Sequence, residues 1–294
     1  MKPKLVISFS GGETSALMTK LLIDNKSDEY DIVVVFANTG RENEETLEFV
    51  ERCDKEFGFN VVWVEALVDM RAGFGIRHTI VDFKTANRTG KPFEDIIKKY
   101  GIPNRTSPYC SEYLKKYTIK SYAKSIGFGK AFIAIGYRND EVDRMSEHRK
   151  RDRLIYPFIS IWPHSKPMVN KWWSMQSFRL NLKGYQGNCK TCWKKSIRKL
   201  MTIAAETPEH FDWDLEMEGK YENFIPESRK SNKNIKPPLR FHRGNLSAKD
   251  ILEMSKQPFE RAVDDTKITM YQESIFNGME LDSSNGCEES CEAF

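Results

Sequence analysis

The sequence predicts an α/β fold: a doubly wound, mostly parallel, Rossmann-like sheet with a smaller C-terminal helical region that bears cysteines. Two observations support this prediction. Short, continuously apolar segments alternate with amphipathic helical segments, which is typical of strands buried on both faces. Several apolar segments end in Gly, Ser, Thr or Asn, and in such folds ligands bind at the carboxyl ends of the strands.

The first strand is expected at residues 5–9, and a helix at 16–23 follows it. The turn between them consists of Ser10, Gly11, Gly12, Glu13, Thr14 and Ser15. Two glycines let the backbone approach an anion closely, and the hydroxyls add donors beside the positive end of the helix dipole. The turn therefore predicts a site for a nucleotide phosphate, and we call residues 10–15 the phosphate turn.

The other strands of the sheet follow the same pattern. We expect them at 31–40, 59–64 and 131–136, with a helix at 44–57 after the first of these. The polar residues that end these strands are Asn38, Thr39, Gly40 and Gly136. They are expected at the same edge of the sheet as the phosphate turn, because the carboxyl ends of parallel strands meet there.

A domain boundary is expected near residue 160, dividing the chain into 1–160 and 161–294. Residues 156–163 are apolar and bounded by prolines, which indicates a strand or a crossing segment. A helix from about residue 169 and a second at 195–206 follow. Four apolar side chains on a core face are expected in and after the first of these helices: Trp172, Trp173, Phe178 and Leu180.

The order Ser-Gly-Gly-x-Thr-Ser after the first strand resembles the pyrophosphate loop (PP-loop) of the ATP pyrophosphatase superfamily. A Walker A lysine and a three-glycine dinucleotide fingerprint are both missing from this turn. Residues 136–144 resemble the Gly-Ile-Arg-x-Asp-Glu-x-x-Arg segment of the phosphoadenylylsulfate (PAPS) reductase branch. The resemblance covers residues 1 to about 220 and is nearest to the reductase-like proteins of phages and mobile elements.

The resemblance implies that Ser10 to Ser15 hold the phosphates of ATP, with Mg²⁺ bridging them. Arg138 and Arg144 would stand near those phosphates and offset the charge that develops on leaving pyrophosphate. The family pattern Asp-Thr-Gly at the end of the second strand is changed here, because Asn38 replaces the aspartate. The amide cannot supply the family's carboxylate to a metal or ribose, but Asn38, Thr39, Gly40 and Gly136 are still expected to contribute to nucleotide binding.

Cysteines provide a second set of candidate residues. Cys189 and Cys192 form a Cys-x-x-Cys pair, and the surroundings of Cys110 resemble the family's Cys-Thr-x-x-Leu-Lys turn. Three cysteines would match the tRNA thiolases, whose iron–sulfur cluster leaves one iron open. Alternatively, Cys287 and Cys291 would join the pair in a four-cysteine zinc or iron–sulfur site, or the thiols would be free. Cys53 is interpreted as an ordinary thiol.

Composition agrees with a cytoplasmic enzyme. The chain has 294 residues, 30% of them charged, and a formal net charge of +4, and no apolar stretch long enough for a membrane span is seen. A net charge of this size does not identify a nucleic-acid-binding protein. A basic, flexible loop is expected near 226–247, where Phe241 and the nearby Trp213 would stack bases if the loop bound a nucleic acid.

Three functions remain open from the sequence. The first is an ATP-dependent adenylating enzyme that serves sulfur transfer to a nucleobase or nucleic acid. The second is a reductase of an adenylylated sulfur compound, although the Glu-Cys-Gly-Leu-His segment of assimilatory reductases is missing. The third is a non-catalytic protein that binds a nucleotide or a host protein. The oligomeric state is left open.

Overall fold

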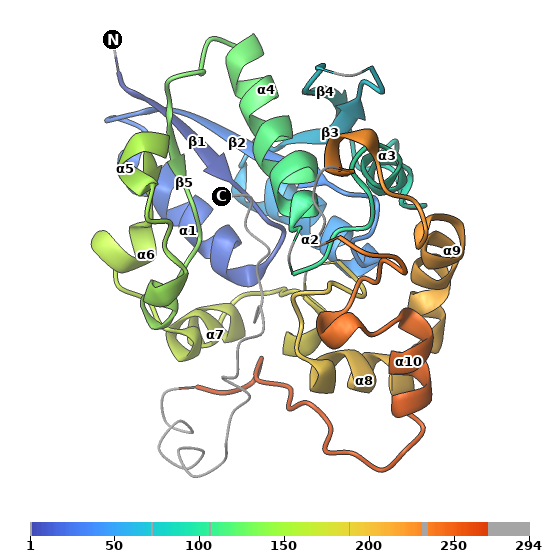
Figure 1. Cartoon of the computed structure of the whole chain (residues 1–294). Helices are drawn as coiled ribbons and strands as arrows, with labels where there is room; N and C mark the ends of the chain where they lie inside the picture. The colour runs from blue at the N-terminus through green and yellow to red at the C-terminus, as the bar shows by residue number, and fades with distance from the viewer. Residues whose placement is uncertain (1, 72, 106, 188, 231–234, 270–294) are drawn as a thin grey trace.

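The computed structural model describes residues 2–71, 73–105, 107–187, 189–230 and 235–269 (Figure 1). Its centre is a six-stranded sheet in the order β4-β3-β2-β1-β5-β6. The strands are β1 (Lys4–Ser8), β2 (Asp31–Asn38), β3 (Val62–Val68), β4 (Ile76–Val81), β5 (Phe132–Ala134) and β6 (Leu154–Ile155). The predicted α/β class with a mostly parallel sheet is confirmed.

Parallel pairing places β1 in the middle of the sheet. It pairs with β2 from Lys4↔Asp31 to Ser8↔Val35, and with β5 on its other side. β4 is antiparallel to β3, and sequence analysis missed it because most of the strand is exposed and polar residues interrupt its apolar ones, with Ile76 buried and Arg77 exposed. β6 was also missed, since two residues form no readable apolar run.

The helices cover both faces of the sheet and build the C-terminal region. The α-helices are α1 (Glu13–Lys26), α2 (Glu44–Phe57), α3 (Lys91–Tyr100), α4 (Tyr117–Ser125), α5 (Arg149–Asp152), α6 (Pro157–Ser160), α7 (Lys166–Ser174), α8 (Ile197–Glu206), α9 (Asp212–Tyr221) and α10 (Ala248–Met254). The π-helix η1 spans Cys110–Lys116. Short 3-10 helices are η2 (Asn139–Arg144), η3 (Gly184–Gln186), η4 (Pro208–Phe211), η5 (Glu227–Arg229) and η6 (Arg243–Asn245).

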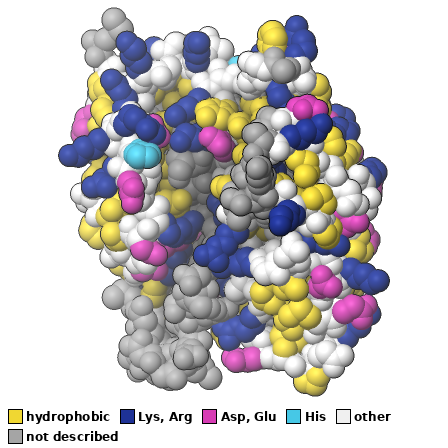
Figure 2. All heavy atoms as spheres, viewed as in Figure 1, with side chains coloured by type: hydrophobic (Ala, Val, Ile, Leu, Met, Phe, Trp, Pro, Cys, Tyr) yellow, Lys and Arg dark blue, Asp and Glu magenta, His cyan; other side chains and the backbone are white. Residues whose placement is uncertain are grey.

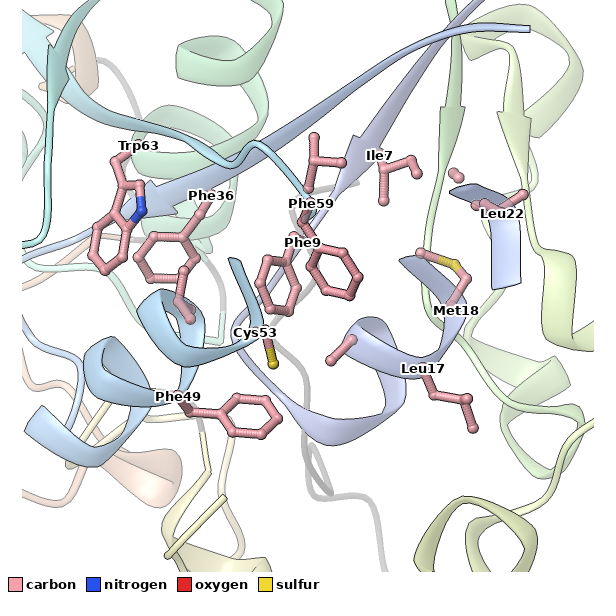
Figure 3. Close-up of a cluster of buried hydrophobic side chains, with 14 of the residues drawn as sticks. Ile7, Phe9, Leu17, Met18, Leu22, Phe36, Phe49, Cys53, Phe59 and Trp63 are labelled. Atoms are coloured by element: carbon pink, nitrogen blue, oxygen red, sulfur yellow. The ribbon is translucent and has the colours of Figure 1, made fainter. Parts of the chain in front are cut away.

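Alternate residues of β1 enter opposite core clusters, as the period of a strand requires. Leu5 and Ile7 pack with apolar residues of α1, α2 and α7, whereas Val6 packs with residues of α4. Figure 3 shows the first of these clusters, where aromatic rings from strand ends meet side chains of α1 and α2. Phe36 and Trp63 pack edge to face with ring centroids 4.8 Å apart.

The segment at 156–163 was interpreted as a strand or a crossing segment, and the strand interpretation is wrong. The strand β6 ends at Ile155, and Pro157 begins the short helix α6, where its fixed φ suits the first turn. The core face predicted for the following helix is confirmed, because Trp173 and Phe178 are buried in the cluster of α1 and α2. Residues on both sides of position 160 thus share one core.

The sequence predicts an exposed, flexible loop for the basic segment at 226–247, but several of its described residues are packed into the protein. Arg229, Leu239, Phe241 and His242 are all buried. The backbone N–H of Phe241 donates to Glu218 at 3.1 Å, which fixes the segment against α9. Base stacking on Phe241 is therefore not available in this arrangement, because only 4% of that residue is exposed. Residues 231–234 lie outside the described residues.

Across the described ranges, no helix combines the length and apolar character needed to cross a membrane.

Gly11 is the tightest point of the fold between β1 and α1. Its φ is +80°, and a Cβ there would lie 2.7 Å from Thr46 Cγ2 and 3.0 Å from Val50 Cγ2. Gly58 shares a left-handed φ of +66°, but a Cβ added to it would have nothing within 4 Å. A side chain at Gly11 would meet both backbone strain and crowding, whereas one at Gly58 would meet backbone strain alone.

We predict that Gly11→Ala lowers the free energy of unfolding by about 2–4 kcal/mol, since backbone strain and overpacking add. Gly58→Ala, which meets the strain alone, should cost about 1 kcal/mol. Urea denaturation followed by circular dichroism measures both. Equal losses in the two variants would show that α2 moves away freely and that the crowding argument is wrong.

Candidate functional site

The turn after β1 is held open by hydrogen bonds among its own residues. Ser15 Oγ accepts from the backbone N–H of Ser10 at 3.2 Å and lies 2.8 Å from Ser10 Oγ. Gly12 is the N-cap of α1, and no side chain caps the first turn of that helix. An uncapped helix N-terminus is the kind of end at which anions bind, and anion binding here stays a prediction.

A small cavity of about 30 Å³ lies beside this turn. Its wall includes Ser10, Gly11, Gly12, Glu13, Thr46, Lys183 and Gly187. Thr14, in the first turn of α1, is buried, and its hydroxyl has no hydrogen-bond partner among the described residues. Thr14 follows the lining residue Glu13 but does not itself line this cavity. An unpaired buried hydroxyl costs about 1–3 kcal/mol, which a hydrogen bond from it would recover.

Glu13 ties the turn to the C-terminal region. Its carboxylate receives a bidentate pair from Arg179, with both N–O distances at 2.9 Å, and a further hydrogen bond from the backbone N–H of Leu180. The side chain of Glu13, predicted to hold a nucleotide, therefore serves to anchor the turn in this structure. Lys183, which lines the same cavity, was missed because no motif surrounds it.

A buried lysine stands close to the same turn. Burial lowers the pKa of Lys166, and the positive charge of Arg138 lowers it further, whereas the nearby carboxylates of Asp265 and Glu13 raise it. Lys166 belongs to α7, and Arg138 follows β5 as the N-cap of η2. Figure 2 shows Lys and Arg side chains spread over this face of the molecule, some of them near its middle.

Asn38 at the end of β2 has a structural reason to be an amide. Its Nδ2 donates to Glu65 Oε1 at 2.6 Å and to the carbonyl of Asn87 at 2.8 Å, while its Oδ1 accepts from Gly40. Burial raises the pKa of Glu65. An aspartate at position 38 would place a second carboxylate against Glu65, which explains the departure from Asp-Thr-Gly.

The segment after β5 lies against the phosphate turn, as predicted. A Cβ at Gly136 would lie 3.0 Å from the Cα of Ser15, so only glycine allows this approach. Arg138 is buried, and its Nε donates to Asp140 at 3.1 Å while its Nη1 lies 3.6 Å from Glu141. Arg144 donates to the same Glu141 and stacks on Tyr137. Both arginines are thus fixed by neighbouring side chains.

The three cysteines expected to act together line one cavity of about 30 Å³. Cys110, Cys189 and Cys192 contribute to its wall beside Thr39, Arg41 and Trp193. Thr39 Oγ1 lies 3.4 Å from Cys189 Sγ, and Trp193 Nε1 donates to Cys110 Sγ at 3.3 Å. We call this space the cysteine pocket. It opens at the end of β2, next to the strand that carries the phosphate turn.

Arg41 connects β2 to the Cys-x-x-Cys segment. Its carbonyl accepts from the backbone N–H of Lys190 at 3.0 Å, and its guanidinium stacks on Trp213 and donates to the carbonyl of His210. The buried carboxyl of Asp214 lies 3.5 Å from the same guanidinium. Burial nevertheless raises the pKa of Asp214 to about 6, because the loss of hydration outweighs the attraction of Arg41.

Cys53 lies apart from these groups, on α2 in the apolar core. Burial strongly raises the pKa of its thiol. The interpretation of Cys53 as an ordinary thiol stays a prediction, and its environment supports it.

No group of three or more His, Cys, Asp or Glu side chains within the described ranges is arranged to hold a metal ion. The cysteine pocket therefore brings three thiols to one cavity without forming a ready ligand set in this arrangement. Cys287 and Cys291, the other two candidate ligands, lie outside the described residues.

The fold agrees with comparisons to known proteins. Residues 4–151 match the model of the phosphoadenosine phosphosulfate reductase domain, which is half of the chain. The chain belongs to this family. An uncharacterized nin region protein of Escherichia phage lambda is 27% identical over 294 residues, covering 98% of this chain and 94% of that protein. The predicted resemblance to the PAPS reductase branch, including its phage-type members, is confirmed.

Two uncharacterized proteins of Methanocaldococcus jannaschii are also similar to this chain. One is 26% identical over 156 residues, or 53% of this chain and 27% of that protein. The other is 29% identical over 159 residues, or 53% of this chain and 31% of that protein. Membership of the family supports nucleotide binding by residues 4–151.

We predict that Asn38→Asp lowers the free energy of unfolding by about 2–4 kcal/mol at pH 7, because it replaces a donor to Glu65 with a second buried carboxylate. Both carboxyls then have pKa values above those of the unfolded chain. Their protonated forms favour the fold, so stability is retained below about pH 4 and lost as pH rises.

Denaturant unfolding of this variant between pH 4 and pH 8 measures the effect. Asn25→Asp, the same change at an exposed position of α1, is the control and should cost less than about 1 kcal/mol. If Asn38→Asp were as stable at pH 8 as at pH 4, the proposed contact of two carboxylates would be wrong.

Proposed function

We propose that this protein binds ATP through Ser10 to Ser15 and cleaves it between the α and β phosphates, transferring adenylate to an acceptor oxygen. The observation that supports this most is the uncapped N-terminus of α1 beside the turn, with the unpartnered hydroxyl of Thr14 in its first turn. Membership of the PAPS reductase family supports a nucleotide as the ligand.

In the proposed step, an acceptor oxygen attacks the α phosphorus. A bond forms between this oxygen and phosphorus while the bond from the α phosphorus to the bridging oxygen breaks, and pyrophosphate leaves with the electron pair. Backbone N–H groups of the turn and the hydroxyls of Ser10 and Thr14 would bind the leaving group. Mg²⁺ would neutralise phosphate charge when bound. Arg138, already fixed by Asp140 and Glu141, would add a preorganised positive charge.

The cysteine pocket supports sulfur transfer as the use of this activation. One thiolate would attack the sulfane sulfur of an external persulfide donor, forming a cysteine persulfide and releasing the donor thiolate. The terminal sulfur would then attack the adenylated carbon, and AMP would leave with the electrons of the carbon–oxygen bond. A second thiolate would displace the product sulfur and form a disulfide, which an external dithiol would reduce.

Metal ligation remains a second proposal for the same three cysteines. An iron–sulfur cluster or zinc held by Cys110, Cys189 and Cys192 would require the side chains to reorient, since they form no ready ligand set. Metal and sulfide analysis of anaerobically purified protein distinguishes the proposals. Iron with sulfide supports a cluster, one equivalent of zinc supports a structural site, and metal-free protein supports persulfide chemistry.

A reductase function is the alternative that the family match favours. It would use a cysteine as nucleophile toward an adenylylated sulfur compound and would release sulfite in the presence of thioredoxin. The same reaction mixtures test it, because adenylation yields AMP and pyrophosphate from ATP, whereas reduction yields sulfite from the sulfonucleotide.

We predict that ATP labelled in its α-phosphate yields labelled AMP or an AMP ester in the presence of a suitable oligonucleotide acceptor. Release of ADP would contradict cleavage between the α and β phosphates.

Thr14→Val should weaken binding of a non-cleavable ATP analogue about ten-fold, as expected for the loss of one hydrogen bond, without lowering stability. Calorimetric titration measures the affinity.

Thr19→Val is the matched control for this variant. Thr19 is a buried residue of the same helix, but its hydroxyl already donates to the carbonyl of Ser15 at 2.7 Å. Its removal should cost about 1 kcal/mol of stability and leave the affinity unchanged. An equal loss of affinity in both variants would show that the Thr14 hydroxyl has no specific role in nucleotide binding.

For the cysteine pocket we predict that Cys189 reacts with iodoacetamide at pH 8 far faster than Cys53. Cys189 is partly exposed, whereas Cys53 is fully buried with a raised pKa. Cys189→Ser and Cys192→Ser should each abolish sulfur transfer while ATP cleavage persists, and Cys53→Ala should retain both. Peptide mapping by mass spectrometry measures the labelling, and unchanged transfer in Cys192→Ser would refute the assignment.

A further inference from the structure

A third cavity lies outside the phosphate turn and the cysteine pocket. Its volume is about 280 Å³, compared with about 30 Å³ for each of those two spaces. Its charged lining is entirely basic among the described residues: Arg105, Arg229, Lys236, Arg240 and Arg243. We call it the basic cavity. A pocket with five cations and no lining carboxylate among those residues is complementary to an anion.

Unpartnered buried atoms are concentrated on this cavity. Seven buried side-chain nitrogen or oxygen atoms of the described residues have no hydrogen-bond partner, and four belong to its lining. These four are Arg229 Nε, Arg243 Nε and the two ring nitrogens of His242. With the ring neutral, three of these atoms are donors. Buried donors are almost always hydrogen-bonded, so their accumulation at one cavity indicates a missing acceptor rather than chance.

Terminal guanidinium nitrogens of both arginines hold the side chains in place. Arg229 donates to the carbonyl of Tyr100 at 2.9 Å and to Ser107 Oγ, and its guanidinium stacks on Tyr109. Arg243 donates to the carbonyl of Lys194 at 2.8 Å. These anchors fix the guanidinium planes before any ligand binds, which lowers the entropy that binding would cost.

His242 is almost completely buried and belongs to the same wall. Its Nε2 lies 3.8 Å from Asp214 Oδ2, beyond hydrogen-bond distance. Burial lowers the pKa of His242 to about 4, so the ring is neutral at pH 7 and offers one donor. Arg105 and Lys236 are exposed and form the rim, and Arg240 is paired with Glu222.

From this arrangement we propose that the basic cavity binds a phosphate group of an anionic ligand, either free phosphate or a phosphodiester of a nucleic acid strand. Arg229, His242 and Arg243 would donate to its oxygens, and Arg105 and Lys236 would add charge at the rim. The binding itself does not depend on ATP cleavage.

The position of the cavity connects it with the cysteine pocket. Phe241 lines the cysteine pocket, and the next residue, His242, lines the basic cavity. Arg243 is bonded to the carbonyl of Lys194, two residues beyond Cys192. If the proposed sulfur transfer is correct, a strand bound here would place acceptor bases beside the reactive thiols, and this use rests on the proposed function.

The test compares binding of inorganic phosphate, by calorimetry, with binding of a labelled single-stranded oligonucleotide, by fluorescence anisotropy. The double variant Arg105→Gln, Lys236→Gln changes exposed rim residues and should fold normally. We expect it to weaken binding at least ten-fold and to reduce the slope of log Kobs against log salt by about 1.4 for the oligonucleotide. Arg243→Gln tests the inner wall independently.

Lys55→Gln, Lys256→Gln removes the same charge from exposed sites elsewhere and should leave binding unchanged. Tight binding of the oligonucleotide alone identifies a phosphodiester, and binding of phosphate identifies the free ion. Failure of both ligands to bind, or equal loss in the control, overturns the proposal. Affinity for the ATP analogue, measured in the same variants, shows separately whether the phosphate turn is intact.

Discussion

The close approach of β1, α1 and α2 at Gly11 is the constraint on which the rest of the structure depends. Because this residue has no side chain, Thr46, Val50 and Phe36 pack against the backbone of the turn. The contact fixes where β1 ends and where α1 begins. β1 lies in the middle of the sheet, and both of its neighbouring strands, β2 and β5, are parallel to it. A second glycine, Gly136, brings the end of β5 against Ser15 in the same way. The close contacts that the backbone makes at Gly11 and Gly136 thus determine the shape of the phosphate turn.

The second feature that organises the site is the end of β2. There Asn38 bonds Glu65 and Asn87, and Arg41 pairs with the Cys-x-x-Cys segment and with residues of α9. Neighbouring strands therefore supply the phosphate turn and one wall of the cysteine pocket. The proposed function needs both places within reach of one ligand, and adjacent strand ends are compatible with it.

The sequence predicted the fold class and the central strands because apolar runs encode them locally, and phosphate binding by residues 10–15 stays a prediction. The antiparallel β4 was missed, since one of its faces is exposed and its polar residues interrupt the apolar pattern. The packing of Phe241 and His242 was missed for a different reason. Their burial depends on Glu218 of α9 and on the core around α3, and such contacts between distant segments leave no periodic signal. The meeting of Cys110 with the Cys-x-x-Cys pair was expected only through family resemblance.

The ion pair between Glu13 and Arg179 has a consequence for how the chain can be divided. If the chain were cut near residue 160, the almost fully buried carboxylate of Glu13 would lose its partner Arg179. The apolar side of α1 that Trp173 covers would also become exposed. A fragment limited to the matched family region would therefore lack part of its own interior. Any shuffling of the C-terminal half between relatives has to carry along a cation able to reach the first residue of α1.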